Sequence, residues 1–183
     1  SSKYDRAVAL IESGDYESAY ILPRGLDYKD SARKRESIRL RYEKILLDRA
    51  KVGDYVFFGT YEQDNDSSNG KEDIEWLVLA KNGNKTLVIS KYALDVQFYN
   101  AEKTATWETS IDKMFLLSIA EAEKYFATNE SRRCSLTAYA KAPGASTSSR
   151  DTTTDDETTC GWWLRSPGEN QYYAAFVRSD GSI

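Results

Sequence analysis

The stretch Val52-Gly53-Asp54 separates two halves of this 183-residue chain in which apolar residues recur with different periods. From Tyr4 to Arg49 they recur at helical spacing. After the stretch the period falls to two and β-forming residues dominate, beginning with Tyr55-Val56-Phe57-Phe58-Gly59-Thr60-Tyr61. The sequence therefore predicts the α+β class, with a helical module over residues 1–50 and a β-rich domain with an antiparallel sheet over residues 51–183.

The helical module contains signals for at least two helices. Gly14 separates the first helix from the second, and Asp15 is placed to cap the second by accepting from free backbone N–H groups. Pro23 and Gly25 are expected to end that helix. Residues 4–19 resemble the first part of a tetratricopeptide-type helical hairpin, with small alanines where two helices approach. A single hairpin of this kind cannot bury its own apolar face, so we expect it to dock on a partner surface.

The β-rich half begins with strands that are expected to be antiparallel neighbours. Ile74–Leu79 and Thr86–Ser90 are dominated by β-forming residues, and Asn82-Gly83-Asn84 between them favours a tight turn with positive φ angles. Ser118-Ile119-Ala120-Glu121 has the sequence of a capping box, which predicts a helix through Phe126. Ala122, Tyr125 and Phe126 are its expected core-facing residues.

The last part of the chain combines a polar segment with further strands. Residues 143–159 are rich in Ser, Thr, Asp and Gly, which predicts a long exposed and mobile loop. Trp162–Arg165 and Tyr172–Val177 read as strands, and Ser179-Asp180-Gly181 reads as a turn into a further strand. Because the chain stops at Ile183, we expect that strand, and the domain, to continue beyond this point.

Composition excludes several classes of function. The net charge of −4 and the pI of about 5.1 argue against a general nucleic-acid binder, which needs clustered Lys and Arg. The chain contains no histidine, so the usual general base and the commonest ligand of catalytic zinc are both missing. No apolar run approaches the roughly 20 residues that cross a bilayer. We therefore expect no catalytic residues, no cofactor and no metal, and a membrane association only through a segment outside this chain.

The β-rich half resembles a largely uncharacterised bacterial domain family, common in gut Firmicutes. Its members share a Gly-Asp-x-Val-x-Phe-Gly-x-Tyr-Glu-Gln start and a Trp-Trp-Leu-Arg-Ser-Pro-Gly segment, found here at Gly53–Gln63 and Trp162–Gly168. Landmarks between them are Phe115–Ser118, Arg132–Cys134 and Thr137–Ala140. The resemblance covers about residues 51 to 183.

This family in turn is similar to C-type-lectin-like domains of the formylglycine-generating-enzyme type, including variable receptor proteins diversified by retroelements. The resemblance implies a mixed lectin-like fold, and it implies an N-terminal membrane anchor preceding tetratricopeptide-like hairpins. Two departures matter. Trp107–Ser110 runs almost directly into Ile111–Met114, where relatives have a helical stretch, and the closing Val-Arg-Pro-Ala-Leu segment is missing.

The segment after Trp162–Gly168 is the candidate ligand-binding surface, because it mixes aromatic residues with adaptable polar groups. The resemblance implies the same place, since related lectin-like proteins hold ligand there. An ordinary hairpin with a polar exposed face is the alternative. The expected ligand-binding residues are Glu169, Asn170, Gln171, Tyr172, Tyr173, Arg178, Ser179, Asp180 and Ser182.

Three neighbouring residues are expected to be structural. Trp162 and Trp163 point to opposite faces of a strand, so at most one lies deep in the core, and core packing is favoured over stacking on a sugar. Arg165 is expected to hold a carboxylate or a set of carbonyls in place. Its loss should destabilise the fold more than it weakens binding.

Two cysteines, Cys134 and Cys160, flank the polar segment and are the right number for one disulfide. A bridge would close a loop of about 26 residues and contribute about 3 kcal/mol. We slightly favour the bridge if the protein is at the cell surface, whereas free thiols would indicate the cytoplasm.

Two acidic segments carry side chains that could ligate a metal ion. Asp64-Asn65-Asp66-Ser67-Ser68-Asn69-Gly70 has the alternating oxygen ligands of a calcium loop, but its glycine is one place late for that loop and no helix is expected to flank it. A solvated hairpin loop is the favoured interpretation. Asp155-Asp156-Glu157 is interpreted in the same way.

The leading hypothesis is a non-enzymatic, receptor- or adhesin-like protein that recognises a protein or glycan ligand and is displayed at the cell surface. A structural or scaffolding role is the alternative, in which Tyr4, Tyr20 and Tyr28 of the helical module contact a partner and the protein can be cytoplasmic. A third possibility is an enzyme, which would use carboxylates such as Glu169 and Asp180, or Cys134 or Cys160 as in a formylglycine-generating oxidase. The copper-binding context of those oxidases is not found in this sequence. The oligomeric state is left open.

Overall fold

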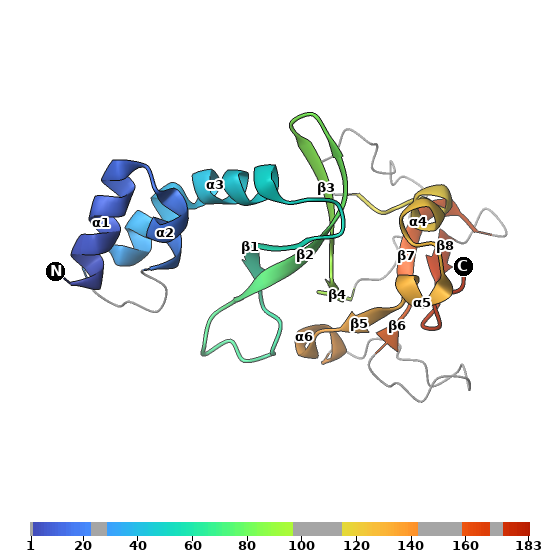
Figure 1. Cartoon of the computed structure of the whole chain (residues 1–183). Helices are drawn as coiled ribbons and strands as arrows, with labels where there is room; N and C mark the ends of the chain where they lie inside the picture. Colours follow the sequence, from blue (N-terminus) through green and yellow to red (C-terminus); the bar gives the residue numbers. More distant parts are fainter. Residues whose placement is uncertain (1, 23–28, 97–114, 143–158, 169–173) are drawn as a thin grey trace, which may run out of the picture. The chain divides into compact units, whose positions relative to one another are not determined.

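The computed structural model describes residues 2–22, 29–96, 115–142, 159–168 and 174–183. Figure 1 shows the elements in chain order, from the blue N-terminal helices to the red C-terminal strands. The described chain contains both helices and antiparallel strands, as the predicted α+β class requires. By internal contacts it divides into two compact units, Ser1–Phe58 with Leu77–Val88 and Gly59–Trp76 with Ile89–Ile183. The predicted boundary near residue 50 stays a prediction.

Three helices form the N-terminal part of the first unit: α1 (Lys3–Ser13), α2 (Tyr16–Ile21) and α3 (Ser31–Arg49). Gly14 ends α1 in the left-handed conformation, with φ of 80°, and the Asp15 side chain caps α2 by accepting from the Ser18 N–H. Ala7 and Ala19 are buried, which is the small-residue contact expected between two closely packed helices. Pro23 and Gly25 lie outside the described residues.

The end of α3 is held by a lysine from a distant strand. The Lys81 ammonium group donates to the carbonyl oxygens of Leu47, Asp48 and Ala50 at 2.7, 2.9 and 2.7 Å. These carbonyls belong to the last turn of the helix, where no intrahelical partner is available and the helix dipole favours a positive charge. One side chain therefore satisfies three backbone acceptors.

The first sheet has the order β1-β2-β3, with β1 at Tyr55–Tyr61, β2 at Glu72–Asn82 and β3 at Lys85–Ser90. All three predicted strands are confirmed. Gly83 and Asn84 form the two-residue connection between β2 and β3, and Gly83 has a φ of 59°. A connection this short joins antiparallel strands.

The second unit contains short helices and strands that were not predicted from the sequence. Strand β4 (Tyr92–Ala93) pairs in parallel with β5 (Cys134–Leu136), and β5 pairs antiparallel with β6 (Thr159–Cys160). Helices α5 (Asn129–Arg132) and α6 (Ala138–Lys141) are capped by Thr128 and Thr137. These elements are two to four residues long, so no periodicity can develop in them.

Helix α4 (Ile119–Tyr125) begins at the predicted capping box. The Ser118 hydroxyl accepts from the Glu121 N–H at 3.2 Å, and the Glu121 carboxylate accepts from the Ser118 N–H at 2.8 Å. Ala122 and Phe126 are buried as expected, while Tyr125 is half-buried.

The C-terminal hairpin consists of β7 (Trp162–Pro167) and β8 (Ala174–Val177), which pair antiparallel with an irregularity between Trp163 and Pro167. Leu164 and Val177 are completely buried and anchor it in the core of the second unit. The structure differs from the prediction after the turn, because Ser182 and Ile183 do not form a strand. No helix among the described residues is long and apolar enough to span a membrane.

Candidate functional site

The β7–β8 hairpin has two unlike faces. Residues directly opposite in the register share a face, and Trp162 is opposite Val177 while Trp163 is opposite Phe176. On one face, Trp163 is 40% exposed and Phe176 is 44% exposed. Their ring centroids are 5.8 Å apart, with an interplanar angle of 67°. The prediction that the two tryptophans face opposite ways is confirmed. Trp163 lies on the side of the hairpin that is open to solvent, so it is not the tryptophan of the pair that packs in the core.

Gly161 and Arg178 extend this exposed side by two residues along each strand. Both are exposed, and a β-carbon built on Gly161 would lie 3.7 Å from the Phe176 ring and 3.9 Å from the Arg178 Cα. Because Gly161 has no side chain, the backbone beside the rings is bare. We call Gly161, Trp163, Phe176 and Arg178 the aromatic face.

The turn that follows β8 is closed by its own backbone. The Arg178 N–H donates to the Ser182 carbonyl at 2.8 Å, and the Gly181 N–H donates to the Arg178 carbonyl at 2.9 Å. The Asp180 carboxylate accepts from the Ser182 N–H at 2.8 Å, and this hydrogen bond lowers the pKa of Asp180 below its usual 3.8. These hydrogen bonds hold the backbone of the turn at Arg178 and the carboxylate of Asp180.

Arg132 ties the turn to α5. Its Nε donates to the Gly181 carbonyl at 2.8 Å, while its two terminal nitrogens donate to the Phe126 carbonyl at 2.7 Å and to Asn129 Oδ1 at 2.5 Å. The Arg132 carbonyl in turn accepts from the Trp162 indole N–H at 3.0 Å. Arg132 thus connects the C-terminal end of α4, helix α5, the turn and β7.

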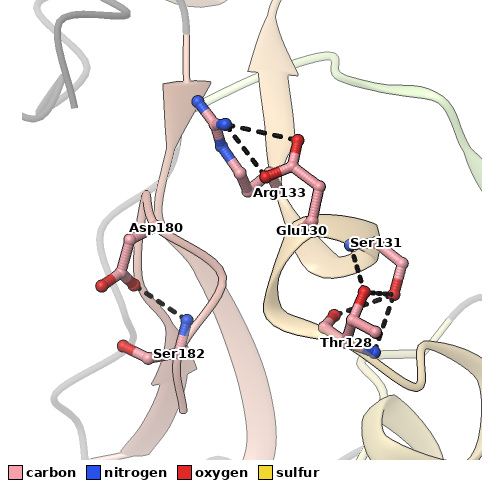
Figure 2. Close-up of polar contacts among 6 residues, drawn as sticks. All are labelled: Thr128, Glu130, Ser131, Arg133, Asp180 and Ser182. Carbon is pink, nitrogen blue, oxygen red and sulfur yellow. Dashed lines mark hydrogen bonds and ion pairs between the residues drawn. The ribbon is translucent and has the colours of Figure 1, made fainter.

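The α5 side of the same region has a separate set of polar contacts (Figure 2). Thr128 and Ser131 form a reciprocal capping box, with hydroxyl and backbone contacts of 3.1 to 3.2 Å. Arg133 and Glu130 form an ion pair at 3.1 Å, with Arg133 mostly buried and Glu130 79% exposed. The Asp180–Ser182 contact lies on the C-terminal turn in the same view.

Arg165 makes the kind of contacts that its expected structural role requires. Its guanidinium pairs with the Glu121 carboxylate at 2.5 Å, donates to the Leu116 carbonyl at 2.5 Å and lies over the Phe115 ring, 5.3 Å from the centroid. Burial alone would raise the pKa of Glu121, but the hydrogen bonds from Arg165 and Ser118 outweigh it and lower that pKa below 4.5. Arg165 therefore connects β7 to the start of α4.

The predicted ligand-binding residues fall into two groups. Glu169, Asn170, Gln171, Tyr172 and Tyr173 lie outside the described residues. Of the others, Arg178 is exposed, Asp180 and Ser182 are half-buried, and Ser179 is 8% exposed. Ser179 is thus buried rather than available for contact. Sequence reasoning missed Phe176, although strand alternation from buried Val177 places it on the exposed side.

A group of carboxylates lies elsewhere in the second unit. Oxygen atoms of Glu62, Asp64 and Glu72 come within 4.8 Å of one another. Burial and the neighbouring Asp64 and Glu72 raise the pKa of Glu62, while hydrogen bonds from Asn69 and the Asp66 N–H lower that of Asp64.

Each of these carboxylates accepts a hydrogen bond from a backbone N–H group of the loop that connects β1 to β2. Glu72 accepts from the Gln63 N–H at 2.7 Å, Glu62 accepts from the Asp66 N–H at 3.0 Å, and Asp64 accepts from the Asp66 N–H at 2.8 Å. A cavity of about 380 Å³ lies beside Asp64 and Glu72. Backbone N–H groups of Gln63 and Asp66 and the Asn69 side chain donate to these carboxylates, and the solvated hairpin loop stays a prediction.

Residues 84–183 match the model of a family described as a domain of unknown function (DUF6273). This match covers more than half of the 183 residues. The chain belongs to this family. No curated protein and no solved structure matches the chain.

The DUF6273 match contains the aromatic face, the C-terminal turn and both cysteines, whereas Glu62, Asp64 and Glu72 precede it. It also contains Trp162–Gly168 but not Gly53–Gln63. The hairpin therefore lies within the matched region, and the carboxylate loop precedes it.

Proposed function

We propose that this protein is a non-enzymatic ligand-binding protein that recognises a protein or glycan through the aromatic face and the adjoining turn. The proposal retains display at the bacterial cell surface, which the resemblance implies. Glu169–Tyr173, which connects β7 to β8 outside the described residues, is proposed as an extension of the same surface.

The observation that carries the proposal is the exposed Trp163–Phe176 pair. The other face of the same hairpin supplies Leu164 and Val177 to the core. The exposure of Trp163 and Phe176 is therefore not something that folding of the hairpin requires. Burying an exposed aromatic side chain contributes about 1.5–3 kcal/mol, which a ligand that covers the pair would gain. Paired exposed aromatics are typical of interaction surfaces.

The surroundings of the pair support recognition rather than nonspecific adhesion. Arg178 adds a charge and a hydrogen-bond donor at one end of the rings, and Asp180 adds an acceptor on the turn. Arg132 and the turn's own backbone hydrogen bonds hold these groups in place. A surface that is ordered before the ligand arrives loses less entropy on binding.

The scaffolding alternative has weaker support. The Tyr4 hydroxyl donates to Asp30 at 2.5 Å, and the Tyr20 ring stacks on Tyr42 with centroids 4.2 Å apart. Tyr28 lies outside the described residues. The two described tyrosines therefore already pack within the helical module instead of forming an open contact surface.

The test is binding of the purified chain to arrays of glycans and of bacterial and host surface proteins. We expect Trp163→Ala and Phe176→Ala each to weaken binding about tenfold or more, as for aromatic hot spots. The matched control is Phe57→Ala, since Phe57 on β1 is 50% exposed and lies outside the DUF6273 match. Binding that survives in both hairpin variants, or that is lost equally in the control, would place the ligand elsewhere.

A second set of variants tests whether the binding surface extends beyond the aromatic face. Tyr172→Ala and Tyr173→Ala should weaken binding to the same ligand if Glu169–Tyr173 takes part. Thermal unfolding of every variant shows whether lost binding comes from lost folding. The class of array probe that binds distinguishes a glycan ligand from a protein ligand.

A further inference from the structure

Cys134 and Cys160 are directly opposite each other on antiparallel neighbours β5 and β6. Opposite residues in such a pair have Cα atoms about 4.5 or 5.5 Å apart, and disulfides span Cα separations of about 4.4–6.8 Å. Either register geometry therefore lies inside the range that a disulfide needs. Both thiols are free in this structure.

We propose that Cys134 and Cys160 form a reversible cross-strand disulfide that fastens β5, which follows α5, to β6 at the start of the β7–β8 hairpin. The bond joins two residues that are already directly opposite in the strand register. The relevance of the bond to ligand binding rests on the proposed function, whereas bond formation and its effect on the hairpin do not.

The chain positions of the cysteines link them to the surface. Cys134 comes two residues after Arg132, which holds the turn through Gly181 and accepts from the Trp162 indole. Cys160 precedes Gly161, the first residue of the aromatic face. A bond between the two therefore joins the segment that holds the turn to the strand that leads into the aromatic face. The short β5–β6 ladder and the contacts of Arg132 also connect these segments.

The two thiols are not equivalent. Cys160 is 4% exposed, whereas Cys134 is half-buried. The hydrogen bond between the thiols lowers the pKa of Cys134 and, together with burial, raises that of Cys160. Cys134 is thus the reachable and more acidic thiol, as an attacking nucleophile should be.

The reaction is a two-step thiol–disulfide exchange with a small-molecule or protein disulfide as oxidant. The Cys134 thiolate attacks one sulfur of the oxidant, which forms a mixed disulfide and releases the first thiolate. Cys160 then loses its proton and its sulfur attacks Cys134 Sγ, which forms the cross-strand bond and releases the second thiolate. Both released thiolates take up the protons lost by the cysteines, and the oxidant's disulfide is reduced to two thiols.

The test uses the full chain in glutathione buffers that range from fully reduced to fully oxidised. We expect free thiols to fall from two to zero without loss of native circular dichroism, and the intact mass to fall by two hydrogens. Hydrogen exchange should slow in β7, β8 and the following turn after oxidation. The unfolding temperature should rise by about 5–10 °C.

Single-cysteine variants separate the two roles. In Cys160→Ala, Cys134 should react with a chromogenic aromatic disulfide about tenfold faster than Cys160 does in Cys134→Ala, because Cys134 is half-buried and Cys160 is 4% exposed. Two thiols that persist in fully oxidised buffer, or that disappear only in denaturant, would overturn the disulfide. A bond that leaves hydrogen exchange in the hairpin unchanged would overturn its fastening role. None of these readouts uses a ligand, so they stand apart from the array experiment.

Discussion

Gly181 lies against the backbone of Asn129 so closely that a β-carbon at position 181 would be 1.8 Å from the Asn129 carbonyl oxygen. The glycine also has a φ of 82°, which other residues rarely adopt. The C-terminal turn can therefore approach α5 only because residue 181 has no side chain. The hydrogen bond from Arg132 to the Gly181 carbonyl depends on this approach.

We predict that Gly181→Ala destabilises the protein by roughly 3 kcal/mol or more, because the turn must move away from α5 and break the Arg132 contact. The control is Gly70→Ala, since Gly70 has a similar φ of 96° but no atom within 4 Å of the place that a β-carbon would occupy. That variant should lose only about 1 kcal/mol. Urea denaturation measures both, and equal losses would contradict the close contact.

We predict that Arg165→Ala lowers the free energy of unfolding by about 2 kcal/mol at neutral pH, because a partly buried carboxylate and the Leu116 carbonyl lose their donor. The pKa of Glu121 is lowered in the folded protein, so its contribution is present above its unfolded pKa near 4.5. That contribution disappears as the pH falls through the lower folded pKa.

The difference between Arg165→Ala and the wild type should therefore shrink on acidification below pH 4.5. Denaturation curves at several pH values measure it. The control is Lys44→Ala, because the Lys44–Asp48 pair has side chains exposed by 77% and 59% and should matter little. A pH-independent difference would show that Arg165 acts without Glu121.

We predict that Lys81→Met costs about 1–2 kcal/mol, since three carbonyls at the end of α3 lose a charged donor. Lys85→Met on β3 is the comparison, because Lys85 is an exposed lysine of the same hairpin. Far-ultraviolet circular dichroism during urea unfolding reports the helical module. An equal loss of unfolding free energy in Lys81→Met and Lys85→Met would contradict a special role for Lys81.

If the protein is a diversified receptor, gene copies from related strains should vary at exposed positions of the surface and stay constant at buried or closely packed positions. We expect adenine-linked changes between Asn170 and Ser182 that include exposed Arg178, while Gly181 and buried Val177 remain fixed. Trp162–Pro167 should be constant. Sequencing these copies tests the idea, and even drift across the domain would leave a binding module without diversification.

Local signals predicted much of the fold. Asp15 and Ser118 were recognisable caps because a helix N-terminus needs a side-chain acceptor, and both cap as expected. Strands β1 to β3 followed from runs of five or more β-forming residues. The short elements β4 to β6 could not be predicted, because their pairings join residues far apart in the chain.

The candidate site was predictable only in part. Strand alternation places Trp162 and Trp163 on opposite faces, but it does not say which face the core covers. That depends on the packing of the whole hairpin, which buries Leu164 and Val177 and leaves Trp163 and Phe176 exposed. Likewise, Ser179 looks available in the sequence and is buried by the turn that Arg132 holds.

Gly161 leaves the main chain bare beside the Trp163 and Phe176 rings. Its missing side chain sets how much of the two rings a molecule from solvent can cover, because even a methyl group there would lie 3.7 Å from the Phe176 ring and 3.0 Å from the Val177 carbonyl. The size of the side chain at position 161 therefore determines how large an area of the aromatic face a ligand can contact. Family members with a larger residue there should present a narrower footprint, which quenching of Trp163 fluorescence by solutes of increasing size can measure.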